Sequence, residues 1–197
     1  MPTLKSHPWG LWLLWAVLAL PGVGMVASWL GGAAAEGMLH GSGEFSARFM
    51  IIAMIATPLR LLLPGWRGPI WLVRRRRAFG VAAFAYAVLH TLFYLDDAQL
   101  LTVVIAELTS PGIWTGWLAF LIFLPLGLTS NDRSQRLMRG AWKRLQRWVY
   151  PAAVLTLAHW ILVHNNIGPA LVHFIPLAAL EIARIRIQRK SAREAYS

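Results

Sequence analysis

Long apolar blocks alternate with short polar segments along the whole chain. Each block is about 20 residues long, the length that a helix needs to cross the ~30 Å hydrocarbon layer of a bilayer. Because lipid offers no partner to unpaired backbone N–H and C=O groups, such blocks cross as helices. The pattern therefore predicts an all-α polytopic membrane protein, a single domain over residues 1–197. Its six transmembrane helices are expected at about 9–30, 46–63, 78–95, 112–129, 147–164 and 167–183.

The first apolar block allows a second interpretation, as a cleavable secretory signal. Lys5 precedes it, and Ala33-Ala34-Ala35 follows it like a cleavage site. The block is longer than the roughly 7–15 apolar residues of a signal core, however. We therefore expect a retained first span.

The charged residues predict the orientation of these spans. The chain has 19 Lys and Arg against 8 Asp and Glu, a net charge of +11. Six spans place both termini and the expected loops 64–77 and 130–146 on one side, together with every Lys and Arg except Arg48. The other side collects the acidic residues Glu36, Glu44, Asp96, Asp97 and Glu107. The positive-inside rule makes the basic side cytoplasmic. We therefore expect a multi-pass membrane protein with both termini in the cytoplasm, and the charge indicates topology and lipid contact rather than nucleic-acid binding.

The residue types limit the chemistry. The absence of cysteine excludes disulfides, iron–sulfur clusters, thiolate metal sites and c-type haem attachment. No Gly-x-Gly-x-x-Gly motif follows a strand, so the chain offers no nucleotide-binding segment of that kind. The eleven tryptophans suit the lipid–water boundary.

Two histidines stand out because they lie inside apolar blocks, where an ionisable side chain is costly and usually functional. His90 follows Arg77 by 13 residues and His159 follows Arg147 by 12. At 1.5 Å per residue, both imidazoles lie about 18–20 Å from the basic boundary, on one level. Two histidines on one level of different helices can ligate a haem iron from both sides.

The neighbours of these histidines fit a flat macrocycle. Small residues precede them on the same helical face: Gly80, Ala83 and Ala87 before His90, and Ala152 and Thr156 before His159. Small residues also mediate helix packing, and a buried histidine can simply hydrogen-bond across helices, so both alternatives stay open. A zinc-like metal centre lacks a third ligand on the level, and the spans contain no Asp or Glu relay of the kind a transporter would use.

The remaining candidates lie near the outer boundary. Arg48 enters the second span and is a candidate for contact with haem propionates. His164, five residues beyond His159, faces another direction and is a candidate for the same contact, or a simple interfacial histidine. His40 is expected in an outer loop, and His173 is expected to begin the sixth span.

Several segments resemble one family. Arg74-Arg75-Arg76-Arg77-Ala78-Phe79-Gly80, followed by Ala87-Val88-Leu89-His90, resembles the third span of the ferric reductase-like transmembrane family. The likeness is greatest to the MsrQ (YedZ) family, the haem-binding membrane subunits of bacterial periplasmic methionine-sulfoxide reductase systems. Further similar segments, spanning residues 40–160, are His40-Gly-Ser-Gly, Ala56-Thr57-Pro58-Leu59, Leu126-Gly127-Leu128-Thr129-Ser130, and Trp142 through Tyr150.

The resemblance implies haem b, with His90 and His159 as axial ligands of its iron. It also implies a cytoplasmic flavin reductase or membrane quinol as electron donor, with FMN as a further cofactor of the system. The implied acceptor is a periplasmic molybdopterin-containing catalytic subunit, so the chain itself would carry electrons and hold no catalytic residue. The alternatives are a ferric-reductase-like carrier with another acceptor, and a haemless transporter or assembly protein.

One departure from the family pattern predicts the number of haems. Two-haem relatives have a histidine 13 residues before the outer ligand of the fifth span, where this chain has Gln146. Arg76 or Arg77 stands where the partner histidine would lie. We therefore expect one haem, on the outer side.

Overall fold

The computed structural model describes residues 8–98, 101–107, 109–164 and 167–194. These residues form helices and connecting turns, with no strand in the described ranges. In chain order the helices are α1 (Pro8–Leu30), α2 (Glu36–Leu62), α3 (Arg67–Asp97), α4 (Leu101–Glu107), α5 (Pro111–Leu128), α6 (Asp132–Met138), α7 (Gly140–Gln146), α8 (Val149–His164) and α9 (Ile167–Glu194). The predicted all-α polytopic class is confirmed.

Four described helices are long and apolar enough to cross a membrane. They correspond to the first four expected spans: residues Gly10–Leu30, Glu36–Leu62, Arg67–Asp97 and Pro111–Leu128. The helices α8, with 16 residues, and α9 occupy the positions of the fifth and sixth expected spans but are not in this group. The last two spans therefore stay predictions.

The helices extend beyond the apolar blocks, which corrects two expected loops. The segment 64–77 is helical from Arg67 onward, and the segment 130–146 contains α6 and α7. A helix satisfies its own backbone hydrogen bonds in water as well as in lipid, and arginine is a good helix former. The end of an apolar block therefore marks the membrane boundary and not the end of the helix.

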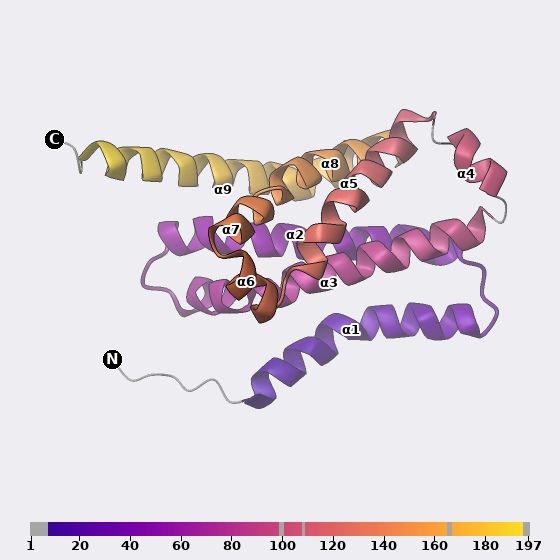
Figure 1. Cartoon of the computed structure of the whole chain (residues 1–197), viewed down its shortest axis with the longest axis horizontal. Coiled ribbons are helices and arrows are strands. Elements are labelled where there is room, and N and C mark those ends of the chain that lie inside the picture. Colours follow the sequence, from indigo (N-terminus) through magenta and orange to yellow (C-terminus); the bar gives the residue numbers. More distant parts are fainter. Residues whose placement is uncertain (1–7, 99–100, 108, 165–166, 195–197) are drawn as a thin grey trace.

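Helix α2 is the centre of the bundle. It packs along the length of α3, and α9 and α8 also contact it, while α5 packs on α8 (Figure 1). Small buried residues allow the close approach of α2 and α3: Ala47 is 1% exposed and Ala83 is 0% exposed. Ser46 Oγ donates a hydrogen bond of 2.9 Å to the Ala83 carbonyl. Such small-residue contacts are the usual basis of helix association in a bilayer.

Helix α1 is attached to α3 by Tyr86, whose hydroxyl hydrogen-bonds to two backbone groups of α1. The Gly22 N–H donates to the Tyr86 hydroxyl at 2.6 Å, and this hydroxyl donates to the Leu18 carbonyl at 3.0 Å. The hydroxyl thus stands between two groups four residues apart, which would otherwise bond each other, and Pro21 lies beside them. An inserted side chain and a proline both bend helices, and α1 is visibly bent (Figure 1).

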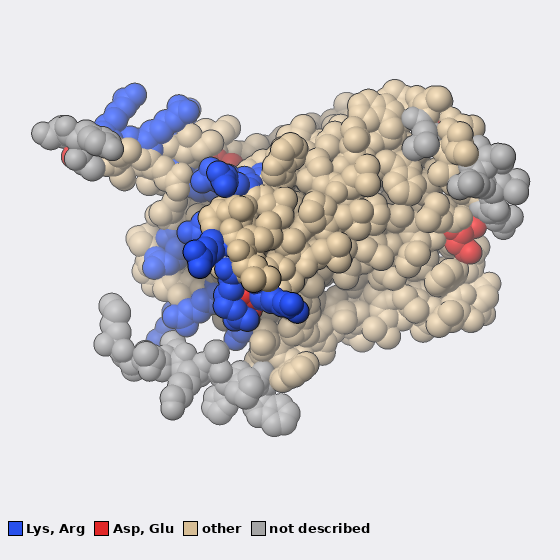
Figure 2. Space-filling view, in the orientation of Figure 1, with Lys and Arg blue, Asp and Glu red and all other residues tan. Residues whose placement is uncertain are grey.

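Charge divides the molecule into two ends. The Lys and Arg side chains gather at the end where α6, α7 and the last turns of α9 lie, and an acidic patch lies at the opposite end (Figure 2). We call these the basic end and the acidic end. The separation matches the charge asymmetry expected from the sequence. The assignment of the basic end to the cytoplasm stays a prediction from the positive-inside rule.

Candidate functional site

A cavity of about 360 Å³ lies between α2, α3, α5 and α8, towards the acidic end. Its wall is mostly apolar, with aromatic side chains from α5 and small residues from α2 and α3. The lining residues are Glu36, Leu39, His40, Gly43, Glu44, Ser46, Ala47, Ala87, His90, Thr91, Tyr94, Ile113, Gly116, Trp117, Ala119, Phe120, Phe123, Thr156, His159, Trp160, Val163 and His164. Apolar walls with a few polar groups are typical of a buried cofactor or ligand site.

The structure brings His90 and His159 together in this cavity. His90 comes from α3 and His159 from α8, and their ring centres are 6.0 Å apart with the ring planes at 78°. Two imidazoles that ligate one metal from opposite sides, through bonds of about 2 Å, have their ring centres roughly 6 Å apart. The expectation that these histidines share one level is therefore met by their positions.

A backbone carbonyl lies at the Nδ1 atom of each histidine. His90 Nδ1 lies 3.0 Å from the Leu39 carbonyl, and His159 Nδ1 lies 2.7 Å from the Gly112 carbonyl. A carbonyl only accepts, so Nδ1 carries the proton and donates, and Nε2 keeps the lone pair. Histidines that ligate metals show this arrangement, in which the second nitrogen donates to a carbonyl or carboxylate.

The small residues singled out in the sequence lie at two depths of the bundle, one at the histidine cavity and one nearer the basic end. Ala87 and Thr156 line the histidine cavity. Gly80 and Ala83 line a second cavity nearer the basic end, and Ala152 is fully buried. Only part of the small-residue pattern therefore serves the histidine site.

Sequence reasoning missed two glycines at this site. Gly43 of α2 lies against the ring of His90, and Gly116 of α5 lies against the ring of His159. The small residues sought in the sequence were on the histidines' own helices. A single sequence does not say which helices become neighbours, so no signal pointed to these two positions.

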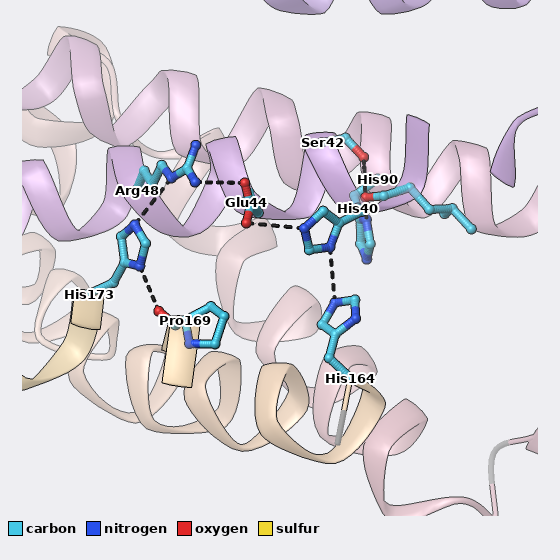
Figure 3. A network of polar contacts seen from close by, with 9 residues as sticks. His40, Ser42, Glu44, Arg48, His90, His164, Pro169 and His173 are labelled. Carbon is cyan, nitrogen blue, oxygen red and sulfur yellow. Dashed lines mark hydrogen bonds and ion pairs between the residues drawn. The ribbon is translucent and has the colours of Figure 1, made fainter. Parts of the chain in front are cut away.

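A network of polar side chains borders the cavity at the acidic end (Figure 3). His40 Nδ1 lies 3.3 Å from His164 Nε2, and His40 Nε2 lies 3.1 Å from a carboxylate oxygen of Glu44. The other Glu44 oxygen accepts from Arg48 at 2.7 Å, and Arg48 Nε donates to His173 Nε2 at 3.3 Å. The network thus joins α2 to both α8 and α9.

His40 does not lie where the sequence predicted, and Arg48 does not line the cavity. The expected loop position of His40 is wrong, because His40 lies inside α2, where helix formation continues beyond the apolar block. His40, Glu44 and His164 line the cavity, whereas Arg48 lies outside its lining. Arg48 instead bonds to Glu44 and His173, and His173 in turn donates to the Pro169 carbonyl at 2.7 Å.

The level nearer the basic end is tightly filled. Gln146, at the end of α7, donates from Nε2 to the Leu126 carbonyl at 3.1 Å. The cavity beside it measures only about 50 Å³. One water molecule occupies about 30 Å³ of liquid, so this space holds no macrocycle.

The arginines expected near this level bond to other groups. Arg77 forms an ion pair with Asp132 and donates to Gln135 at 2.8 Å, and Arg76 donates to Thr57 at 3.2 Å. The hydrogen bond from Arg77 lowers the pKa of Asp132 below its ordinary value. The Arg77 contacts connect α3 to α6 at the basic end, and the Arg76 contact connects α3 to α2.

The described residues contain no group of three or more His, Cys, Asp or Glu side chains able to hold a metal ion. A metal at the histidine pair would therefore need further ligands from water or from a cofactor. A porphyrin supplies four ring nitrogens of its own, so two axial imidazoles complete the coordination of its iron.

The fold and the histidine pair define a class: an all-α polytopic membrane protein with a cavity lined by two adjacent imidazoles. Residues 42–157, more than half of the chain, match the family model described as ferric reductase like transmembrane component. The match includes His90 and ends just before His159.

The curated relatives narrow this class. Three of them bear the name Protein-methionine-sulfoxide reductase heme-binding subunit MsrQ. The one from Rhizobium meliloti (strain 1021) is 32% identical over 196 residues, covering 96% of this chain and 88% of the relative. The one from Azospira oryzae is 33% identical over 174 residues (83% and 73%), and the one from Brucella ovis is 32% identical over 167 residues (81% and 74%).

The chain therefore belongs to the ferric reductase-like transmembrane family and, within it, to the MsrQ family. The resemblance seen in the sequence is confirmed. No solved structure matches the chain.

Proposed function

We propose that this chain is the haem-binding membrane subunit of a methionine-sulfoxide reductase system and that it carries electrons through one haem b. His90 and His159 would be the axial ligands of the haem iron. One observation carries the proposal: two imidazoles from different helices line one apolar cavity with their ring centres 6.0 Å apart. The names of the MsrQ relatives support it.

The residues present fit this group. Both Nδ1 atoms are bonded to carbonyls, which leaves both Nε2 lone pairs for iron. The bound haem would supply reversible one-electron chemistry, and two imidazoles leave no open iron position, which favours electron transfer over oxygen binding. Phe120, Phe123 and Trp160 would exclude water from the macrocycle and keep the site apolar.

The polar network would serve the carboxylates of the cofactor. A haem carries two propionates, and His164 lines the cavity at its acidic end. We propose His164 as a propionate contact, with Arg48 as a second contact once it exchanges its bond to Glu44 for one to a propionate. A guanidinium that bonds a carboxylate here already has the chemistry for another.

The two ends of the molecule would meet different partners. We propose that the basic end faces the cytoplasm of a bacterium and receives electrons from a flavin reductase, with FMN as carrier, or that quinol in the inner membrane is the donor. The acidic end would then face the periplasm and a molybdopterin-containing catalytic subunit. The concentration of Lys and Arg at one end supports this orientation.

Spectroscopy of purified protein tests the proposal. The reduced protein should show the sharp visible band of a b-type haem. His90→Ala and His159→Ala should each abolish this band, whereas His173→Ala should retain it, because His173 does not line the cavity. A colourless wild-type protein would refute the haem proposal and favour a haemless transporter or assembly protein.

The acceptor needs a separate test, because a ferric-reductase-like carrier would use the same haem site. Reduced protein should be reoxidised by the periplasmic catalytic subunit together with methionine sulfoxide. Rapid reoxidation by ferric ion, without reaction with that subunit, would assign the alternative function.

A further inference from the structure

We propose that Gly43 and Gly116 are positioning residues that fix the imidazoles of His90 and His159 and keep their planes nearly perpendicular. The proposal rests on the proposed function in so far as these rings ligate a haem iron. We call each glycine, together with the carbonyl four residues before it, a seat.

The seat of His159 lies on α5. A Cβ atom on Gly116 would lie 2.6 Å from His159 Nδ1 and 2.7 Å from Cε1, distances that real Cβ contacts do not show. The ring therefore occupies the place of the missing side chain. One helical turn earlier, the Gly112 carbonyl accepts from the same Nδ1 at 2.7 Å. One helix thus contacts the ring at two successive turns.

The seat of His90 repeats this arrangement on α2. A Cβ atom on Gly43 would lie 3.2 Å from both Cε1 and Nδ1 of His90. The Leu39 carbonyl, again one turn before the glycine, lies 3.0 Å from Nδ1. Two unrelated segments of the chain therefore share the glycine and the carbonyl, and at His90 the Ser42 hydroxyl also lies 3.3 Å from Nδ1 (Figure 3).

Among the described helical glycines, Gly43 and Gly116 are the two at which an added Cβ would meet an imidazole. An added Cβ on Gly22, Gly41, Gly112 or Gly127 would meet other side chains. Gly37 on α2 and Gly80 on α3 have nothing within 4 Å of an added Cβ. A methyl group at Gly43 or Gly116 would instead push against an imidazole. Because Nδ1 is also bonded to a carbonyl, the ring has little freedom to rotate in response.

The two seats explain why the rings are crossed. Each seat fixes the plane of its ring relative to its own helix, α2 or α5, and the resulting planes stand at 78°. If the seats persist around a bound haem, the ferric protein will show the strongly anisotropic low-spin electron paramagnetic resonance signal of perpendicular axial imidazoles. Parallel imidazoles would give the ordinary rhombic low-spin signal.

The first experiment compares Gly116→Ala, Gly43→Ala and the control Gly80→Ala in haem-loaded protein. Loss of such a supporting contact typically weakens metal binding about 10- to 100-fold. We expect a weakening in this range for Gly116→Ala, with loss of the anisotropic signal. Gly43→Ala, with the longer contact, should lose less haem affinity than Gly116→Ala and should shift the signal. Gly80→Ala should match the wild type in affinity and signal. Alanine is the better helix former, so helix weakening does not explain a loss.

The second experiment uses haem-free protein, so that the seats are tested whether or not haem binds. Nitrogen NMR of protein labelled at histidine should show His90 and His159 protonated at Nδ1. Gly116→Ala should shift the His159 signals away from this state, Gly43→Ala should shift those of His90, and Gly80→Ala should change neither.

The outcomes separate the two proposals. Protein that shows the Nδ1 tautomers and their loss in the variants, but binds no haem, would retain the seats and refute the haem function. Protein that binds haem with a rhombic signal, or whose glycine variants match the wild type in both experiments, would refute the seats and retain the function.

Discussion

The two levels of the bundle differ in what they can contain, although α2, α3, α5 and α8 contribute to both. Towards the acidic end, α2, α3, α5 and α8 enclose about 360 Å³ around His90 and His159. Towards the basic end, a space of about 50 Å³ remains beside Gln146. Helix backbones therefore do not determine the capacity of this bundle for a cofactor. The side chains at each level determine it. At one level the rings of His90 and His159 lie against glycines; at the other, Gln146 is hydrogen-bonded to the Leu126 carbonyl and the ring of Phe84 lies against Gly127.

Substitution of Phe123 should have the largest effect on this difference in cavity size, because Phe123 lines both cavities. Its side chain is 7% exposed and belongs to the main core. Phe123→Ala would join the two spaces and should destabilise the protein by roughly 3–5 kcal/mol, the usual cost of such a truncation.

Thermal unfolding in detergent measures this loss. Leu121→Ala, on the same helix but 56% exposed, is the control and should cost far less. Equal losses for the two variants would show that Phe123 does not separate the levels.

Substitutions at Gln146 test whether the level nearer the basic end can hold a haem. Gln146→Ala removes the hydrogen bond to the Leu126 carbonyl and should cost about 0.5–1.5 kcal/mol of stability. Gln146→His should not create a second haem site, because the space beside it is too small and no histidine faces it among the described residues that line it.

Measurement of the number of haems bound per polypeptide tests this prediction. Both Gln146 variants should bind as much haem as the wild type. A second haem in Gln146→His, or lost haem in Gln146→Ala, would contradict the difference between the levels.

The smallest expected effect concerns the ion pair that connects α3 to α6 at the basic end. The pKa of Asp132 is lowered by Arg77, so the pair stabilises the protein above the ordinary carboxyl pKa of 3.8. This contribution disappears as the pH falls through the lowered pKa. Because Asp132 is exposed, the effect should be small and should weaken in salt.

A comparison of Asp132→Asn, Arg77→Gln and the double variant measures this coupling. The unfolding temperatures should show a small coupling at neutral pH and none in strong acid. Haem binding should be unchanged, because this pair lies away from the histidine cavity. A coupling that persisted in strong acid would contradict the assignment to an ion pair.

The successes and failures of the sequence analysis have separate physical causes. The membrane class and the shared level of His90 and His159 follow from the rise of a helix and the thickness of a bilayer, and both agree with the structure. The expected loop at 64–77 and the loop position of His40 were wrong, because an apolar block indicates burial in lipid and does not indicate where a helix ends. No feature of the sequence indicated the hydrogen bonds between the Tyr86 hydroxyl and the backbone of α1.

The amino-acid sequence by itself determined that this chain forms helices in a membrane, that its charge divides between two ends, and that two histidines reach the same depth. These properties depend on local composition and on distance along one helix. Only the tertiary structure decided which helices face those histidines. It placed Gly43 and Gly116 against the rings and His40 beside His164, which is 124 residues away along the chain. Contacts of this kind arise from the packing of helices against one another, and hydrophobic pattern alone does not specify that packing.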